Sequence, residues 1–152
     1  MADEWAHKDI WKRRGHDFLI EVSRHEVAVD FDQPSWRRDG PHRWAVYAYI
    51  YPKHPRFGRF VGRDLFQPAA NDLSLHGCAS YLERHYDDDG TQTCIQVGCD
   101  YNHLHDEQYT HMETREDAVS VFNDAERLFT LLSDGSGQTP IADAPATETM
   151  AP

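Results

Sequence analysis

The chain has 152 residues, enough for one domain with a core, and its 39% hydrophobic and 27% charged residues are typical of a globular domain. No apolar run approaches the ~20 residues that span a membrane, and the first residues lack the basic start and apolar middle of a signal peptide, so we expect a cytoplasmic protein. The net charge of −11 is uneven, because residues 1–63 carry 12 Lys and Arg against 9 Asp and Glu, whereas residues 64–152 carry 3 against 17. This acidic part argues against direct binding of nucleic acid and suits a basic protein partner.

The first 31 residues predict a helix followed by two strands. Residues 1–15 hold Trp5, Ile10 and Trp11 among charged residues and end at Gly15, which predicts an N-terminal helical arm. Alternating apolar residues then predict strands at 17–23 and 27–31, joined by a turn at 24–26.

Residues 43–51 are the clearest strand, rich in aromatic and β-branched side chains, and Pro52 ends it. One face carries Tyr47, Tyr49 and Tyr51. We interpret this tyrosine face as packed core, with stacking on a ligand as the alternative.

The remaining elements are a hairpin and one long helix. Strands are predicted at 79–82 and 91–97, with an exposed hairpin tip at 84–91. Thr114 and Asp117 approximate a capping box, and seven apolar residues follow at helical spacing: Ala118, Val121, Phe122, Ala125, Leu128, Phe129 and Leu132. Residues 135–152 are rich in Gly, Ser, Thr, Ala and Pro, which predicts a disordered tail. The pattern indicates an α+β fold, with residues 16–134 forming one domain. Its antiparallel sheet has about four to six strands, with the C-terminal helix packed across it.

Chemistry-bearing residues gather in the segment 98–106, Gly-Cys-Asp-Tyr-Asn-His-Leu-His-Asp, and in a smaller segment around His76. Asp100, His103 and Asp106 are spaced three apart, and together with His76 they offer oxygen and nitrogen ligands of the kind that Zn or Mn binds. Three interpretations stay open. The residues form a buried polar network that orders a loop, a divalent-metal site, or an organic-ligand or acid–base site in which a histidine carries the proton.

Three cysteines, Cys78, Cys94 and Cys99, are an odd number and are expected to be reduced in the cytoplasm. We interpret them as small buried apolar side chains. Metal ligation by Cys78 or Cys99 and a redox role are the alternatives.

The middle of the chain resembles a family of small uncharacterised proteins of phages and actinobacteria. The matching residues are His54-Pro55, then His76-Gly77 with Tyr81, then Gly98, Asp100, His103 and Asp106. In this chain Cys78 replaces the second glycine of the His-Gly-Gly-x-Thr-Tyr pattern. The resemblance implies a phage or mobile-element origin and, for a phage-encoded protein, action in the host cytoplasm, but no particular activity.

These observations give one leading hypothesis and two alternatives. The leading hypothesis is a non-enzymatic, phage-type accessory protein that binds a basic host protein or a small metabolite, as a counter-defence inhibitor would. Its binding corner would contain His76, Tyr81, Asp100, His103 and Asp106, or it would use its acidic surface. The first alternative is a metal-dependent hydrolase with His76, Asp100, His103 and Asp106 as ligands. The second is an acidic mimic of nucleic acid.

Overall fold

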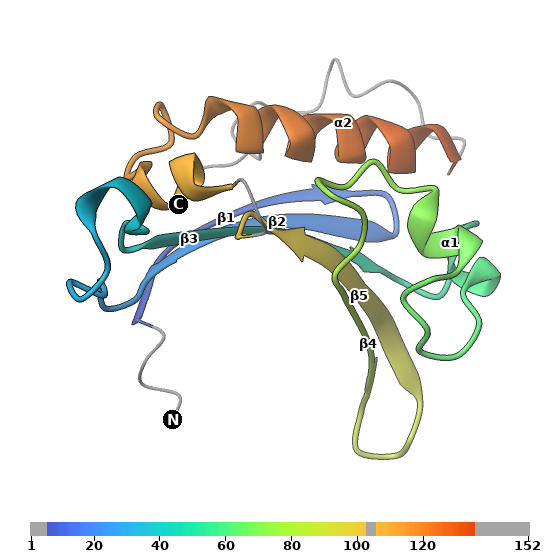
Figure 1. Ribbon diagram of the computed structural model, residues 1–152. Helices are drawn as coiled ribbons and strands as arrows, with labels where there is room; N and C mark the ends of the chain where they lie inside the picture. The colour runs from blue at the N-terminus through green and yellow to red at the C-terminus, as the bar shows by residue number, and fades with distance from the viewer. Residues whose placement is uncertain (1–5, 103–105, 136–152) are drawn as a thin grey trace.

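The computed structural model describes residues 6–102 and 106–135, and the structural statements that follow concern these residues. Five antiparallel strands form one sheet in the order β1-β2-β3-β5-β4. Their bounds are β1 Ala6–Gly15, β2 Phe18–Glu26, β3 His42–Ile50, β4 Tyr81–Tyr86 and β5 Gln92–Asp100. Helix α2 (Val119–Gly135) lies across one face of the sheet, so the α+β prediction is confirmed (Figure 1).

The core lies between α2 and the sheet. All seven apolar residues that the sequence placed on one side of the helix are buried. They pack mainly over β2 and β3, where Phe18, Ile20 and Val46 are also buried. The capping box is present before the helix, since Asp117 N–H donates to Thr114 Oγ1 at 3.1 Å and Thr114 N–H donates to Asp117 Oδ2 at 3.2 Å. The predicted disordered tail begins at the last residue of α2, and from residue 136 onward it lies outside the described residues.

The helical arm predicted over residues 1–15 was wrong in its described part, because Ala6–Gly15 is strand β1, paired with β2. Trp11 and Arg13 face α2. On this side of the sheet, Trp11 stacks on Trp44 of β3 with ring centroids 5.7 Å apart. Arg13 is buried with its guanidinium 3.8 Å from the centre of the Phe129 ring and paired with Glu126. A charged residue at an inward position hid the two-residue period of a strand.

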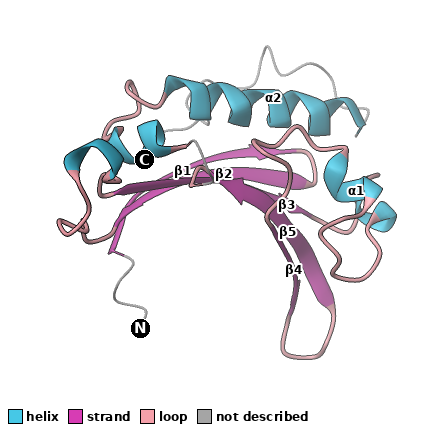
Figure 2. Ribbon diagram, viewed as in Figure 1, coloured by secondary structure: helices cyan, strands magenta, loops and turns pink. Residues whose placement is uncertain are grey.

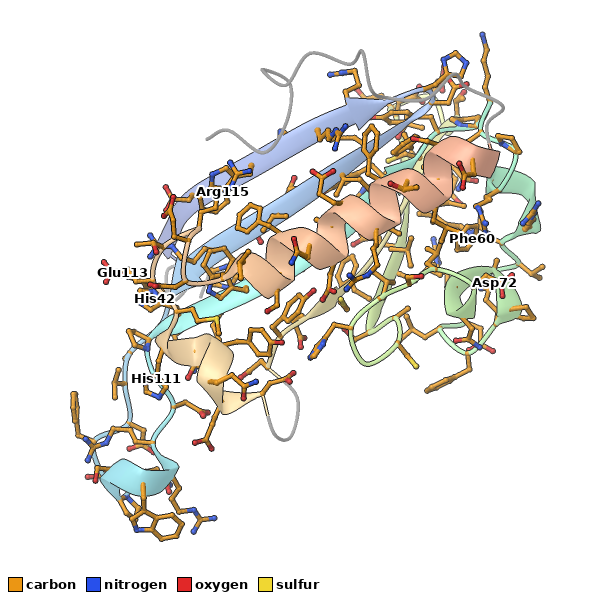
Figure 3. All side chains as sticks on the ribbon, turned by 90° about the horizontal axis from the view of Figure 1, so that it is seen from above. His42, Phe60, Asp72, His111, Glu113 and Arg115 are labelled. Atoms are coloured by element: carbon orange, nitrogen blue, oxygen red, sulfur yellow. The ribbon has the colours of Figure 1, made fainter. Side chains whose placement is uncertain are left out.

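The turn predicted at residues 24–26 was also wrong, because β2 runs unbroken through it, and residues 27–31 form no strand. Arg24 is the cause. It is buried on the helix side, where it donates to Asp9 Oδ2 at 2.8 Å and to the Glu113 carbonyl at 2.7 Å. His42 lies beside the same guanidinium, and Figure 3 shows His42 and Glu113 together near the beginning of α2.

The loop from β3 to β4 carries the short helices η3 (Phe57–Arg59) and α1 (Pro68–Asn71) and crosses to the far edge of the sheet. The hairpin tip predicted at 84–91 is confirmed at residues 87–91, where Gly90 has a φ of +89°, but residues 84–86 belong to β4, which lies later in the chain than the predicted strand 79–82. Arg84 in β4 donates to the Phe60 and Gly62 carbonyls and so ties the hairpin to this loop. Of the helices in the described ranges, none combines the length and apolar character that crossing a membrane requires.

The second face of the sheet, which we call the open face, has no described element packed over it. Figures 1 and 2 show α2 on the opposite side and the β4–β5 hairpin bending away from the helix, which makes the open face concave. The tyrosines of β3 lie here and are half-buried. No described segment therefore packs over the tyrosine face that we interpreted as core.

Candidate functional site

His76 and Asp106 lie in contact, as the clustering in the sequence suggested. His76 Nε2 lies 2.9 and 3.0 Å from the two oxygens of the Asp106 carboxylate and donates to it. Asp106 is buried and directly precedes the 3₁₀ helix η4 (Glu107–His111), whereas His76 belongs to the loop that leads into β4. The pair therefore fastens two segments that are 30 residues apart in the chain.

Aromatic rings surround this pair. The His76 ring stacks on Tyr101 at 4.4 Å and meets the edge of Tyr109 at 5.4 Å. The Tyr101 hydroxyl donates to Asp124 Oδ2 in α2 at 2.7 Å, and burial, together with neighbouring Cys99 and Asp124, raises the pKa of Tyr101 far above its usual value. Stacking and hydrogen bonds thus join the His76 loop, η4 and α2. The contacts match the interpretation of a buried polar network that orders a loop.

Asp100 and Tyr81, two further residues of the predicted corner, lie on the open face. Successive side chains of a strand point to opposite faces, so Asp100 and its neighbour Tyr101 are separated by the sheet. Asp100 is exposed and lines a hollow of about 100 Å³ with His25, Arg43 and others. His103 lies outside the described residues. The structure therefore brings together two of the five predicted residues and places two others on the opposite face.

No three His, Cys, Asp or Glu side chains within residues 6–102 and 106–135 are close enough to share a metal ion. Cys94 and Cys99 are buried, and burial raises the pKa of both thiols, that of Cys99 to about 12. Both thiols are therefore protonated near neutral pH and are poor nucleophiles. The interpretation of the three cysteines as buried side chains was wrong for Cys78, which is exposed and has a φ of +74°.

Four hollows on the described surface have volumes of about 100 to 450 Å³, and His76 and Asp106 line none of these four. The larger three are lined mostly by charged and polar side chains at the helix and in the β2–β3 loop.

The open face gathers the tyrosines of β3, which the sequence analysis interpreted as packed core, together with Tyr81, which it placed in the binding corner. Tyr47 in β3 and Tyr81 in β4 both pair with Gly98, which lies between them in β5. Their rings meet edge to face, with centroids 5.4 Å apart and planes at 73°. A Cβ atom on Gly98 would lie 2.6 Å from Tyr47 Cδ1, so the glycine lets the Tyr47 ring lie over β5.

The next row on the open face contains Tyr49, Gln96 and Glu83, again from β3, β5 and β4. The Tyr81 hydroxyl donates to the Glu83 carboxylate. His85 contacts Gln96 Oε1 through Nε2 at 2.8 Å, and its ring lies 6.4 Å from that of Tyr49. The sequence signal for this surface was the run of alternating tyrosines in β3, which an uncovered sheet face explains as well as a core does.

Carboxylates shape the electrostatics of these phenols. The hydrogen bond to Glu83 is the main cause that raises the pKa of Tyr81 to about 12. Burial raises the pKa of Tyr47 and Tyr49, with Glu21 adding to both. The rings therefore stay neutral at physiological pH, and negative charge lies close to their hydroxyl ends.

Comparison of the chain with models of protein families, with curated proteins and with solved structures finds no match.

Proposed function

We propose that this protein acts by binding a partner protein through the open face of its sheet rather than by catalysing a reaction. The observation that carries the proposal is the group of half-exposed rings on a concave surface over which no described element packs. Tyrosine is enriched in protein interfaces because it offers a large rigid contact area together with a polar end.

The shape of the open face favours a protein over a metabolite. Sites that enclose small molecules usually have volumes of about 300–1,000 Å³. The hollow beside Tyr47 and Asp100 measures about 100 Å³. A broad, shallow surface with exposed hydroxyl, amide and carboxylate groups is instead typical of a contact between macromolecules.

The biological setting of the proposal comes from the sequence. A small acidic protein that resembles phage proteins would act on a host protein in the host cytoplasm, and counter-defence is one such role. The metal-dependent hydrolase and the nucleic-acid mimic stay predictions of the sequence. The contacts of the His76–Asp106 pair support a structural role for these two residues within the binding protein.

A capture experiment tests the proposal with matched variants. The protein would be immobilised and exposed to an extract of cells in which it is naturally produced, and retained proteins would be identified by mass spectrometry. Tyr81→Ala should abolish retention of a specific partner, whereas Phe66→Ala should not, because Phe66 is 86% exposed but lies in the loop before α1.

A partner retained equally by Tyr81→Ala, Tyr47→Ser and the unaltered protein would contradict the proposal. Circular dichroism spectra of the variants would first establish that each is folded. Turnover of a substrate with loss of activity in His76→Ala, in a protein that is still folded, would favour an enzyme instead.

A further inference from the structure

The open face is electrostatically divided. Lys12 and Arg14 lie on β1, at one side of the sheet, with Glu21 paired to Lys12 in register. Glu83 and Asp100 lie on β4 and β5, at the other side. Burial raises the pKa of Tyr51 and nearby Arg14 partly opposes this, whereas carboxylates add to the rise in the pKa of Tyr47 and Tyr81. Tyr47 and Tyr81 thus lie on the negative side, near Asp100 and Glu83.

We propose that Tyr47, Tyr81 and Glu83 bind an arginine side chain of the partner protein. This inference rests on the proposed function and specifies the chemistry of the partner. A guanidinium stacks on aromatic rings, whose faces are electron-rich, and it also donates two parallel hydrogen bonds to a carboxylate. The two rings at 73° to one another, with a carboxylate at the end of one of them, offer both kinds of contact.

Among the described residues, none of the chain's own arginines occupies this position. Its arginine–aromatic contacts are formed elsewhere, on Trp36, Phe31, Phe122 and Phe129. Arg43, the arginine of β3 on this face, donates to the carbonyls of Gly40 and His42 at one end of the strand. Glu83 is exposed and accepts a hydrogen bond from Tyr81, which leaves further lone pairs of the carboxylate for a donor from outside.

The position of Gly98 makes the arrangement possible. Because Gly98 has no side chain, the Tyr47 ring lies over β5 and meets the Tyr81 ring edge to face. The partner's arginine would lie on the exposed side of this ring pair and reach Glu83 in the next row. An overall charge of −11 also attracts a basic partner over long range.

The test uses N-acetylated hexa-arginine amide as a probe, titrated into the ¹⁵N-labelled full chain and followed by heteronuclear NMR. The matched probe is hexa-citrulline, whose side chains have nearly the shape of arginine but no charge. Amide resonances of residues 47, 81, 83 and 98 should shift with hexa-arginine and stay unchanged with hexa-citrulline. Tyr81→Ala and Glu83→Gln should each weaken binding about five- to tenfold, and Tyr81→Phe should retain more affinity than Tyr81→Ala.

Asp88→Asn is the matched control for Glu83→Gln, because it removes one negative charge at the hairpin tip, away from Tyr47 and Tyr81. Equal weakening by Asp88→Asn and Glu83→Gln would overturn the inference in favour of general attraction to acidic surface. Binding of hexa-citrulline as strong as that of hexa-arginine would also overturn it.

The two proposals fail separately. A captured partner that depends on Tyr81 but does not compete with hexa-arginine would overturn the arginine site and leave the proposed function intact. Concentration-dependent shifts of the same resonances without any probe would show self-association and would overturn the choice of partner. Specific binding of hexa-arginine at these residues supports the inference even if the capture experiment fails.

Discussion

Replacing Gly98 with alanine tests whether the tyrosine pair depends on the bare backbone of β5. The added Cβ would lie 2.2 Å from the Val46 carbonyl oxygen and 2.6 Å from Tyr47 Cδ1, both too close for atoms that are not bonded. The Tyr47 ring has room to turn toward the open side. The Val46 carbonyl belongs to the backbone of β3, which is paired with β5, so relief requires the two central strands to shift.

The expected cost follows from these contacts. Adding a methyl group where the neighbours are tightly packed destabilises proteins by about 1–3 kcal/mol, and the backbone contact places Gly98→Ala toward the upper end. Replacing glycine also restricts the unfolded chain, which offsets up to about 1 kcal/mol. A net loss of about 2 kcal/mol would lower Tm by about 4–8 °C for a chain of this length.

Thermal unfolding followed by circular dichroism would measure this change. Gly58→Ala is the control, because nothing lies within 4 Å of its Cβ position, and it should leave Tm unchanged or raise it slightly. Adding Tyr47→Ala to Gly98→Ala should not restore stability, since the contact with Val46 remains. A Gly98→Ala protein as stable as the Gly58→Ala protein would refute the reasoning.

Three further predictions concern the His76–Asp106 pair, a buried histidine and the thiols. His76→Ala should lower the free energy of unfolding by about 1–3 kcal/mol, because it leaves the buried Asp106 carboxylate without this donor; an unchanged urea midpoint would contradict a stabilising role. His54 is held neutral, since Nε2–H donates to the Leu132 carbonyl and Nδ1 accepts from Arg56 N–H, and burial lowers its pKa. The unfolded chain then takes up the proton at higher pH than the folded chain, so Tm should be constant above about pH 7 and fall as the pH drops below about 6.5. An equally steep fall in His54→Gln would assign the effect to other groups. A thiol reagent should label Cys78 in the folded protein and all three cysteines in denaturant, and rapid native labelling of Cys99 would show that its burial is transient.

The sequence predicted the long helix and the central strand because their buried residues are almost all apolar. The sheet-facing side of α2 and the alternation around Trp44 and Val46 could be predicted without knowledge of tertiary contacts. β1 and the second half of β2 were missed because Arg13 and Arg24 point inward. Each of these arginines is stabilised by partners distant in the chain, Glu126 and Glu113 among them, and no local pattern encodes such partners.

The candidate site was also predictable only in part, because it too depends on contacts between segments that are distant in the chain. Proximity of His76 to Asp106 requires the loop before β4 to lie beside η4, which the clustering of polar residues suggested correctly. Asp100 lies on the opposite face from Tyr101, on which His76 stacks, because successive strand residues alternate, and this would have been foreseen had β5 been extended through Asp100. The open face could not be foreseen, because the tyrosines of β3 give the same alternation whether or not another layer covers them.

The strand order has a consequence for how the chain folds. β5 completes the middle of the sheet, yet it follows its neighbour β3 by about 40 residues in the chain. Strands β1 to β3 can pair as soon as they are synthesised, because each follows its partner directly. The backbone N–H and C=O groups along one edge of β3 then stay unpaired until the β4–β5 hairpin forms and docks through β5. We expect closure of the long β3–β5 loop to be the slow step of folding, and until it occurs the unpaired edge is a site for chaperones and aggregation.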